Sequence, residues 1–148
     1  MSKLKNSKLA DIDGPVSAVM TPLPLVVESS TSFHTVERLF QRYDIRHLPV
    51  MDGSVILGVI SDREVEAVIR STPQSKDSEP IRAVVVKAFL EAEADARAID
   101  VINEMASKKY DCSLILREKK VVGIFTLSDA IQLLLRFRTL NALPGTGE

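Results

Sequence analysis

The chain repeats itself at an offset of 65 residues. The segment Gly-Val-Ile-Ser-Asp-Arg-Glu, which begins at Gly58, returns from Gly123 as Gly-Ile-Phe-Thr-Leu-Ser-Asp. The same offset superimposes Pro15 on Pro80 without a gap. A repeat of this size is one supersecondary unit that must bury its apolar face, and the second copy is the nearest neighbour available. We expect the two units to be related by a pseudo-two-fold axis, with a cleft where they meet, and we look for function in that cleft.

Composition indicates a small globular protein. The 148 residues are 45% hydrophobic and 26% charged, with a formal net charge of −1, which gives no general attraction to nucleic acid or to anionic membranes. No apolar run reaches the length of about 20 residues that a membrane-spanning helix needs, and the basic N-terminus lacks the apolar stretch of a secretion signal. The single cysteine, Cys112, forms no internal disulfide, which fits a reducing compartment. We expect a cytoplasmic protein without a membrane partner.

Each copy shows the same order of predicted elements, namely helix, strand, helix, strand, strand and helix. Ser30 and Asp95 are expected to cap the long helix of each copy, and two apolar runs joined by a tight turn predict a hairpin. The predicted segments are short helices at 16–20 and 81–86, first strands at 25–27 and 89–91, hairpins at 47–60 and 112–125, and last helices at 62–71 and 127–138. This order predicts an α+β fold in which each copy is a small three-stranded sheet packed with helices.

Composition also predicts the boundaries of the two copies. A stretch rich in Ser and Pro at 72–79 has the character of a linker. It separates a first repeat at 15–71 from a second repeat at 80–138. We expect a flexible N-terminal tail at 1–14 and a C-terminal tail at 139–148.

Three motifs resemble a cystathionine β-synthase (CBS) domain. They are Val-Met-Thr-Pro at 19–22, Ile-Arg-His-Leu-Pro-Val at 45–50, and the segment after Gly58. Because the predicted elements and motifs occur twice in the same order and spacing, the chain resembles a tandem CBS pair, or Bateman module, over about residues 15–138. The second copy departs from the pattern, with Leu114 in place of Pro49 and Lys87 in place of Pro22.

The resemblance implies a ligand and the residues that hold it. CBS pairs bind adenosine-containing ligands between the repeats and act as energy or metabolite sensors. In the family motif Gly-x-x-Ser/Thr-x-x-Asp, the hydroxyl contacts phosphate and the Asp holds the ribose. This assigns Ser61 and Glu64 in the first copy and Thr126 and Asp129 in the second. A hydroxyl and free N–H groups at a helix N-terminus favour an anion on physical grounds as well. The alternative is that both pairs are capping boxes that only stabilise the helix starts.

Further residues complete the predicted site. Arg63 is a candidate phosphate partner, and Glu64 is one methylene longer than the usual Asp, so Asp129 is the better ribose ligand and we expect one site to dominate. Arg46 and His47 precede a strand and are either ligands or a solvated loop end. The predicted ligand-binding residues are Thr21, Arg46, His47, Ser61, Arg63, Glu64, Thr126 and Asp129.

No catalytic or metal site is predicted. The chain lacks the nucleophile elbow, the phosphate-binding loop and the dinucleotide fingerprint. Its two histidines have no cysteine partner for a structural zinc ion, and Cys112 is expected to be a small buried hydrophobe. We therefore expect a protein that is not an enzyme and requires no cofactor, with a regulatory adenine nucleotide as its ligand.

The sequence thus favours a stand-alone regulatory CBS pair. We expect it to bind AMP, ADP, ATP, NAD or S-adenosylmethionine in the cleft between the repeats, and to signal to a protein effector or through its own assembly. A homodimer is expected through the apolar last helix, which carries Ile131, Leu133, Leu134, Leu135 and Phe137. The competing hypothesis is a ligand-free structural dimerisation or adaptor module, favoured by Glu64, Leu114 and Ser128. Nucleic-acid binding would need a basic face at which the sequence only hints.

Overall fold

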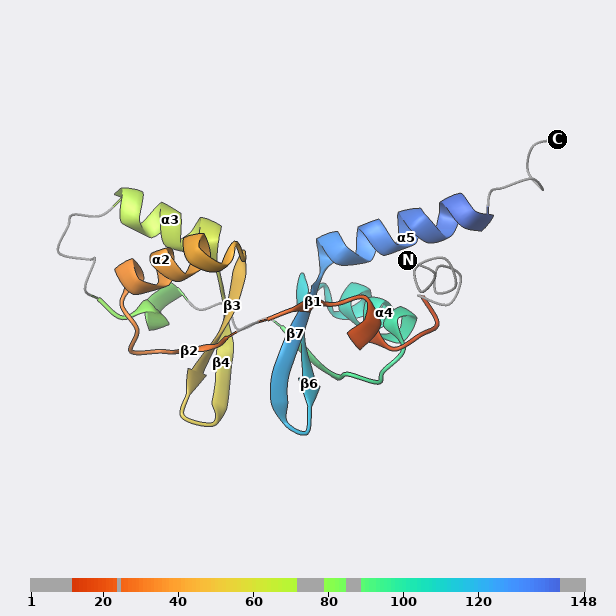
Figure 1. Ribbon diagram of the computed structural model, residues 1–148, viewed down its shortest axis with the longest axis horizontal. Coiled ribbons are helices and arrows are strands. Elements are labelled where there is room, and N and C mark those ends of the chain that lie inside the picture. Colours follow the sequence, from red (N-terminus) through yellow and green to blue (C-terminus); the bar gives the residue numbers. More distant parts are fainter. Residues whose placement is uncertain (1–11, 24, 72–78, 85–88, 142–148) are drawn as a thin grey trace. The chain divides into compact units, whose positions relative to one another are not determined.

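The computed structural model describes residues 12–23, 25–71, 79–84 and 89–141 (Figure 1). Contacts divide the chain into two compact units. We call Leu23–Phe89 the continuous unit, and Met1–Pro22 with Leu90–Glu148 the split unit. The α+β class and the two-repeat architecture predicted from the sequence are confirmed. Most of the predicted linker and of the two tails lies outside the described residues.

The continuous unit is a three-stranded sheet packed with helices. Its strand order is β2-β3-β4, in which β2 is parallel to β3 and β3 is antiparallel to β4. The large apolar side chains Phe33, Phe40 and Ile60 are buried together in its core. The elements are β2 (Val27–Glu28), α2 (Phe33–Tyr43), β3 (His47–Asp52), β4 (Val55–Ser61), α3 (Asp62–Ser71) and the 3-10 helix η3 (Ile81–Val84).

The split unit repeats this plan with one additional strand. Its sheet has the order β1-β7-β6-β5, and the added β1 pairs antiparallel with β7, so that Thr21 lies opposite Ile124. The core gathers Met105, Ile115 and Phe125. The elements are the 3-10 helix η1 (Val16–Ala18), β1 (Thr21–Pro22), β5 (Leu90–Glu93), α4 (Ala98–Lys108), β6 (Cys112–Arg117), β7 (Lys120–Thr126) and α5 (Leu127–Asn141).

The first residues of each repeat are buried in the compact unit that holds most of the other repeat. Val16 is buried in the split unit, where its N–H donates to Ala96 O at 2.7 Å. Ile81 is buried in the continuous unit, where its N–H donates to Thr31 O at 2.9 Å. The two hydrogen bonds are equivalent under the 65-residue offset. As a result, residues just before β1 lie beside the second copy of the repeated motif rather than the first.

An ion pair holds the N-terminal segment on the split unit. Arg97 Nη2 lies 2.7 Å from Asp13 Oδ1, and Arg97 Nη1 lies 3.8 Å from Asp100 Oδ1. The hydrogen bond to Asp13 is the main cause of a raised pKa at Arg97, and the attraction of Asp100 adds to it. Arg97 therefore remains charged.

The structure corrects the predicted helix starts. The N-cap of α2 is Ser32 rather than Ser30, because the Ser32 hydroxyl accepts from Thr35 N at 3.2 Å. The N-cap of α4 is Arg97 rather than Asp95, and it makes no side-chain cap hydrogen bond. Both predicted caps lie in the turn that precedes the helix. The strands β2 and β5 also end later than predicted, and β1 was not predicted at all.

Candidate ligand-binding site

The second copy of the motif lies where β7 ends and α5 begins. Asp129 Oδ2 accepts a hydrogen bond from Thr126 N at 2.9 Å, and Asp129 N donates to Thr126 Oγ1 at 3.1 Å. This is the reciprocal arrangement of a capping box, in which side chains satisfy N–H groups that the helix leaves unpaired. The capping box, which the sequence offered as the alternative to a ligand site, is therefore formed in the structure. The capping box does not use every polar group of the Thr126 and Asp129 side chains.

Thr21 joins this pair from the N-terminal segment. Its hydroxyl donates to Asp129 Oδ2 at 3.4 Å, because the pairing of β1 with β7 holds Thr21 at the edge of the sheet. Within the described part of the chain, Asp129 Oδ1 accepts no hydrogen bond and the Thr126 hydroxyl donates none. Three predicted site residues, Thr21, Thr126 and Asp129, are thus brought together in the split unit.

Gly123 makes this approach of β1 possible. A Cβ atom built on Gly123 would overlap Met20 Sδ and would lie 2.9 Å from Thr21 O, closer than real Cβ contacts. The absence of a side chain at this position in β7 lets the backbone of Met20 and Thr21 lie against the strand. The glycine of the repeated motif therefore has a structural role in positioning Thr21.

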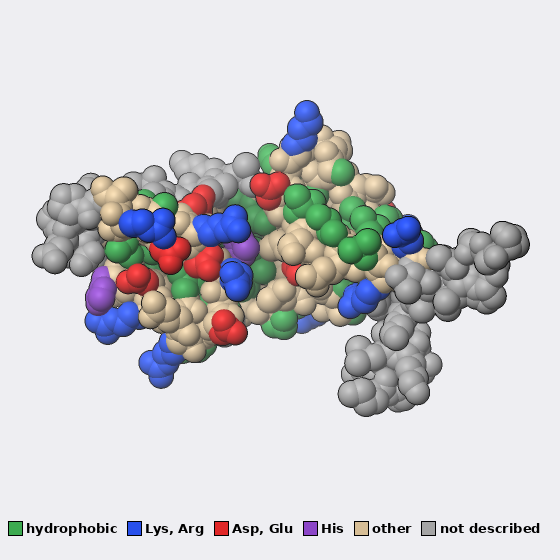
Figure 2. All heavy atoms as spheres, turned by 90° about the horizontal axis from the view of Figure 1, so that it is seen from above, with side chains coloured by type: hydrophobic (Ala, Val, Ile, Leu, Met, Phe, Trp, Pro, Cys, Tyr) green, Lys and Arg blue, Asp and Glu red, His purple; other side chains and the backbone are tan. Residues whose placement is uncertain are grey.

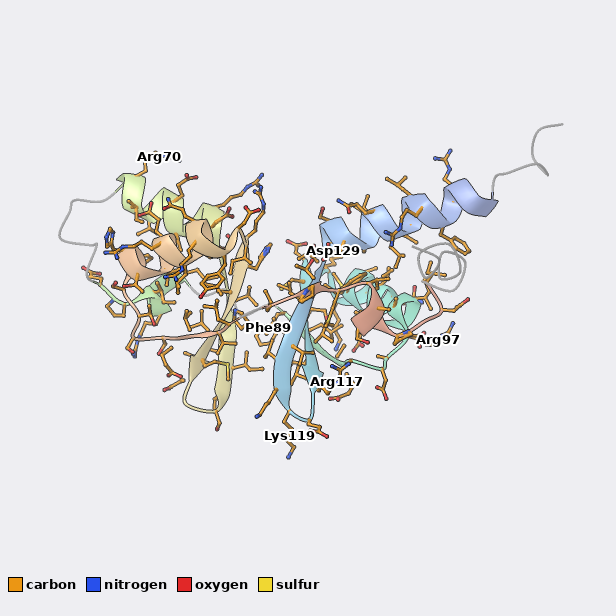
Figure 3. The ribbon with its side chains drawn as sticks, in the orientation of Figure 1. Arg70, Phe89, Arg97, Arg117, Lys119 and Asp129 are labelled. Carbon is orange, nitrogen blue, oxygen red and sulfur yellow. The ribbon has the colours of Figure 1, made fainter. Side chains whose placement is uncertain are left out.

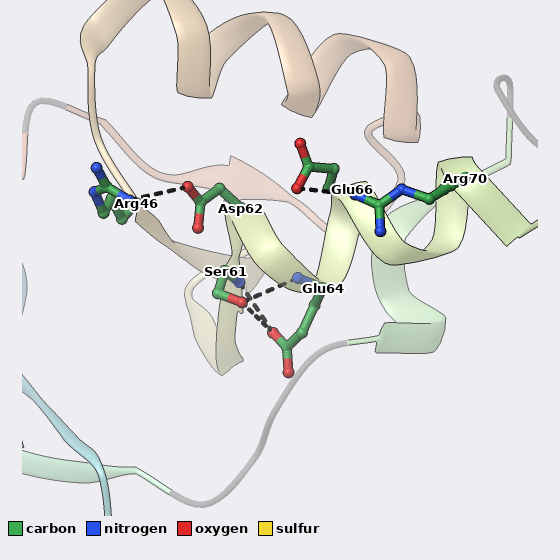
Figure 4. A network of polar contacts seen from close by, with 6 residues as sticks. All are labelled: Arg46, Ser61, Asp62, Glu64, Glu66 and Arg70. Carbon is green, nitrogen blue, oxygen red and sulfur yellow. Dashed lines mark hydrogen bonds and ion pairs between the residues drawn. The ribbon is translucent and has the colours of Figure 1, made fainter.

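The first copy of the motif is arranged differently (Figure 4). Glu64 Oε1 accepts from both Ser61 N and Ser61 Oγ at 3.0 Å, and Glu64 N donates to Ser61 Oγ at 3.2 Å. The longer Glu side chain folds back onto Ser61, so the serine hydroxyl both donates and accepts within the motif. Compared with Thr126, Ser61 therefore has its hydroxyl proton already engaged.

The other residues predicted for the first copy lie around the same strand end. Arg46 Nη1 lies 3.8 Å from Asp62 Oδ2, and Asp62 N donates to Arg46 O at 3.0 Å (Figure 4). His47 is paired in register with Ser61, while Arg63 is exposed at the start of α3. The structure thus gathers Arg46, His47 and Ser61 at one end of the β3–β4 hairpin.

Asp62 is the residue that the sequence argument missed. The signal was available, because a hairpin that pairs His47 with Ser61 also sets Arg46 opposite Asp62. The corresponding position to Arg46 in the second copy is Asp111, whose carbonyl accepts from Leu127 N at 2.8 Å. The two motifs consequently differ in charge as well as in hydrogen bonding.

Cys112 is buried at the start of β6, as expected for a small hydrophobe. Among the described residues, no group of three His, Cys, Asp or Glu side chains comes together in a way that could hold a metal ion. In the same ranges, no helix has the length and apolar character that crossing a membrane requires.

Two sheet–helix units with matching Ser/Thr motifs at a strand-to-helix junction define a tandem repeat of small α+β modules. The CBS domain profile matches residues 16–71 and 81–136. The chain therefore belongs to the CBS domain family, with two copies in tandem. A search of curated proteins finds no match.

Solved structures share this fold. An uncharacterized conserved protein from Pyrococcus horikoshii is 28% identical, with a TM-score of 0.63 over 82% of this chain and 92% of that one. The CBS domain of a bacterial CNNM/CorC family Mg²⁺ transporter in complex with ATP is 17% identical, with a TM-score of 0.70 over 91% and 96% of the two chains. The CBS domain pair of protein MJ0100, in complex with 5′-methylthioadenosine and S-adenosylmethionine, is 19% identical, with a TM-score of 0.63 over 81% and 94%.

Proposed function

We propose that this protein is a regulatory CBS pair that binds an adenosine-containing ligand at the Thr126–Asp129 motif. AMP, ADP, ATP, NAD and S-adenosylmethionine are the candidate ligands. Occupancy is signalled to a protein effector or through the protein's own assembly. No reaction is assigned to the site, because its residues bind and orient a ligand and present no activated nucleophile.

The observation that carries this proposal is the hydrogen bonding of the Asp129 carboxylate. One of its oxygens, Oδ2, is held by Thr126 N and by the Thr21 hydroxyl. This fixes the carboxylate while Oδ1 retains its capacity to accept from a ribose hydroxyl. The Thr126 hydroxyl can donate to a phosphate beside the N-terminus of α5, where helix N–H groups favour an anion.

The first motif is the weaker candidate. The Ser61 hydroxyl already donates to Glu64 Oε1, so it would have to break this hydrogen bond before it could donate to a ligand. Arg46 and Arg63 offer positive charge there, although Arg46 lies beside Asp62. We propose that this motif contributes less to affinity than the second and contacts the phosphate rather than the ribose. His47 is proposed as a further contact on the same strand end.

Bound ligands in related structures support the class of ligand. The transporter CBS domain was solved with ATP, and the MJ0100 pair with 5′-methylthioadenosine and S-adenosylmethionine. At 17% and 19% identity these relatives share the fold, and they do not distinguish between the adenylates.

Calorimetric titration with each of the five ligands tests the proposal. We expect saturable heat from at least one of them, with an affinity that falls tenfold or more in Asp129→Ala, because hydrogen bonds to a charged acceptor contribute roughly 1.5–3 kcal/mol each. The matched control is Glu64→Ala, the equivalent change in the first motif, for which we expect a smaller loss. Absence of heat from all five ligands at millimolar concentration would rule out adenylate sensing.

A homodimer through α5 is the second part of the proposal. Leu133, which the sequence suggested for the interface, is buried in the core of the split unit. Other apolar side chains of α5 are instead exposed, and Figure 2 shows hydrophobic side chains gathered over this helix. They are Leu127 at 49%, Ile131 at 50%, Leu134 at 39% and Leu135 at 52% exposure. An exposed apolar stripe of this kind supports a contact with a second protein surface.

The competing function is a structural dimerisation module without a ligand. The closed Ser61–Glu64 pair and the exposed stripe of α5 favour it. Under this hypothesis the titrations are silent while the dimer persists, so the same protein sample distinguishes the two functions.

A further inference from the structure

The first copy of the motif carries positive and negative charges in equal number. Two carboxylates, Asp62 and Glu64, are accompanied by two guanidinium groups, Arg46 and Arg63. Arg46 Nη1 lies 3.8 Å from Asp62 Oδ2, and Arg63 is exposed at the start of α3. Positive charge beside a helix N-terminus is a common means by which proteins hold a phosphate group. The first motif therefore has side chains that can compensate the charge of a phosphate.

The second copy of the motif has no positive charge at the equivalent positions. The 65-residue offset places Asp111 where the first copy has Arg46, and Ser128 where it has Arg63. The carboxylate of Asp129 corresponds to that of the first copy and is retained as a second negative charge. The second motif thus presents two carboxylates, and the guanidinium groups that accompany the carboxylates of the first motif are both replaced.

Backbone hydrogen bonds fix Asp111 beside this site. Asp111 O accepts from Leu127 N at 2.8 Å, and Cys112, the next residue, is paired in register with Thr126. Asp111 is exposed, whereas Thr126 and Asp129 are half-buried. The residue that carries the additional carboxylate therefore touches the first residue of α5 through its own backbone. Its negative charge belongs to the surroundings of any ligand that Asp129 holds.

The N–H groups at the start of α5 are largely engaged within the chain. Leu127 N donates to Asp111 O. Thr126 N donates to Asp129 Oδ2, and Asp129 N donates to Thr126 Oγ1. An anion at this helix start therefore gains few N–H contacts that could offset its repulsion by two carboxylates. The Thr126 hydroxyl can serve a single anionic oxygen, which is less than a chain of phosphates requires.

We propose that the second motif selects adenosine ligands by the charge of their 5′ substituent, and that it prefers a neutral or cationic substituent to a chain of phosphates. The preference rests on the proposed function, because it concerns the ligand that Asp129 holds. Asp111 determines this specificity, since it sets a carboxylate where the first copy has a guanidinium. Arg46 and Arg63 act in the opposite sense in the first motif, which contributes less to the affinity.

The candidate ligands differ strongly in this charge. S-adenosylmethionine carries a sulfonium and an ammonium group against one carboxylate, whereas AMP, ADP and ATP carry increasing negative charge. We therefore expect S-adenosylmethionine to bind more tightly than the three nucleotides, and the affinity to fall from AMP to ADP to ATP. Because the carboxylates of the site are partly solvated and are screened by salt, each added phosphate should weaken binding about threefold.

Calorimetric titration of the full chain in the absence of divalent cations tests this order. Magnesium is left out because a bound cation changes the charge of the phosphates. Adenosine is the uncharged reference, and we expect it to bind more tightly than ATP. In about 0.5 M NaCl the difference between AMP and ATP should shrink, since salt screens the repulsion. The affinity for adenosine should not respond to salt in this way.

Variants at position 111 show whether this carboxylate causes the preference. Asp111→Arg introduces the residue of the first copy, and we expect it to raise the affinity for ATP about tenfold and to lower that for S-adenosylmethionine. The affinity for adenosine should stay unchanged. Asp111→Asn removes the charge alone and should give an intermediate result. Because Asp111 is exposed, neither change should unfold the chain, which the melting temperature checks.

Two controls separate a local effect from a change of net charge. Glu118→Arg makes the same change of charge next to Arg117, which Figure 3 shows at the opposite end of the strands from Asp129. Lys109→Asn removes the cation nearest to Asp111 in the sequence, and Asn tolerates the positive φ of 60° at this position. We expect both controls to keep the order of affinities.

The outcomes distinguish the charge preference from the proposed function. Absence of heat from every ligand overturns both. If ligands bind but ATP is held as tightly as AMP, or if Asp111→Arg leaves the order of affinities unchanged, the charge preference is overturned and adenylate binding stands. An equal gain for ATP in Glu118→Arg overturns the preference as well, because net charge alone then accounts for the effect.

Discussion

Thr21 and Asp129 lie 108 residues apart in the chain, yet the hydroxyl of Thr21 donates a hydrogen bond to Asp129 Oδ2 at 3.4 Å. The contact exists because β1 adds to the edge of the β7 strand. The start of the first repeat therefore supplies a side chain to the motif of the second. Substitutions at either residue should therefore change the affinity for the same ligand.

Replacing Thr21 by Val tests this relationship. The change keeps the shape of the side chain and removes the hydroxyl, so Asp129 loses one of the donors that orient it. We expect the affinity for the adenylate to fall about three- to tenfold, which corresponds to the loss of one hydrogen bond. Calorimetry measures the change, and Thr31→Val in the continuous unit is the control. An unaltered affinity in Thr21→Val, when Asp129→Ala abolishes binding, would place Thr21 outside the site.

The two capping boxes separate stability from binding. Thr126→Ala and Ser61→Ala each remove the hydroxyl that accepts from the N–H three residues later, and we expect each to lower the free energy of unfolding by about 1 kcal/mol. We expect only Thr126→Ala to weaken ligand binding as well, because the Ser61 hydroxyl already donates to Glu64. Urea denaturation and calorimetry on the same samples measure both effects.

Ser128→Ala is the control for these two variants, since Ser128 is exposed on α5 and its removal should leave both quantities unchanged. Equal losses of affinity in Thr126→Ala and Ser61→Ala would show that the two motifs contribute alike, contrary to the asymmetry proposed here.

A side chain at Gly123 should dislodge β1. In Gly123→Ala the added methyl group would meet Met20 and would lie 2.9 Å from Thr21 O, and a backbone oxygen cannot move without distorting the strand pair. We expect a loss of about 1–3 kcal/mol in the free energy of unfolding, together with weaker ligand binding through Thr21. Shortening Met20 to Ala in the same chain should recover only part of the stability, because the clash with the Thr21 carbonyl remains. Full recovery would locate the strain in the Met20 side chain alone.

Sequence periodicity predicted the elements that depend on local signals. The first hairpin, predicted at 47–60, followed from two apolar runs joined by a glycine turn. The pairing of Thr21 with Ile124 did not, because a two-residue edge strand has no periodicity of its own and is determined by tertiary contacts. For the same reason the burial of Val16 in the second repeat had no local signal. The capping box of Asp129 with Thr126 was predictable from the motif, whereas the hydrogen bond of Asp129 to Thr21 required the fold.

The buried hydroxyl of Ser113 provides a prediction about the core. Ser113 is 0% exposed, and its Oγ has no hydrogen-bond partner among the residues that the structure describes. It occupies the position equivalent to Leu48 in the continuous unit and lies opposite Phe125 in the strand pair. An unsatisfied buried polar group costs roughly 1–3 kcal/mol, so Ser113→Ala should raise the free energy of unfolding by about 1 kcal/mol. Ser29→Ala, which removes a buried hydroxyl that accepts from Arg82, should instead lower it. A destabilised Ser113→Ala would mean that the hydroxyl is satisfied in solution.

The exposed stripe of α5 predicts how the protein associates. Ile131 and Leu135 lie one helical turn apart and are each about half exposed, whereas the equivalent positions on α3 are Glu66 and Arg70, which form an ion pair at 3.3 Å. The described part of α3 therefore lacks the apolar face that α5 presents at these positions. In the double variant Ile131→Glu, Leu135→Glu, two such faces cannot pack without burying carboxylates, which is unfavourable unless they are paired. We expect the sedimentation coefficient to change from that of a dimer to that of a monomer.

The control for this variant is Val55→Glu, which changes a side chain that is 60% exposed on the β3–β4 hairpin. Neither the double variant nor the control should alter the free energy of unfolding of a single chain by more than about 0.5 kcal/mol per site, because these side chains contribute little to the core. A loss of the dimer confined to the α5 variant therefore locates the interface on that helix. If the dimer survives in the α5 variant, or if both variants dissociate, the interface lies elsewhere, and occupancy of the nucleotide site must be signalled through a different surface.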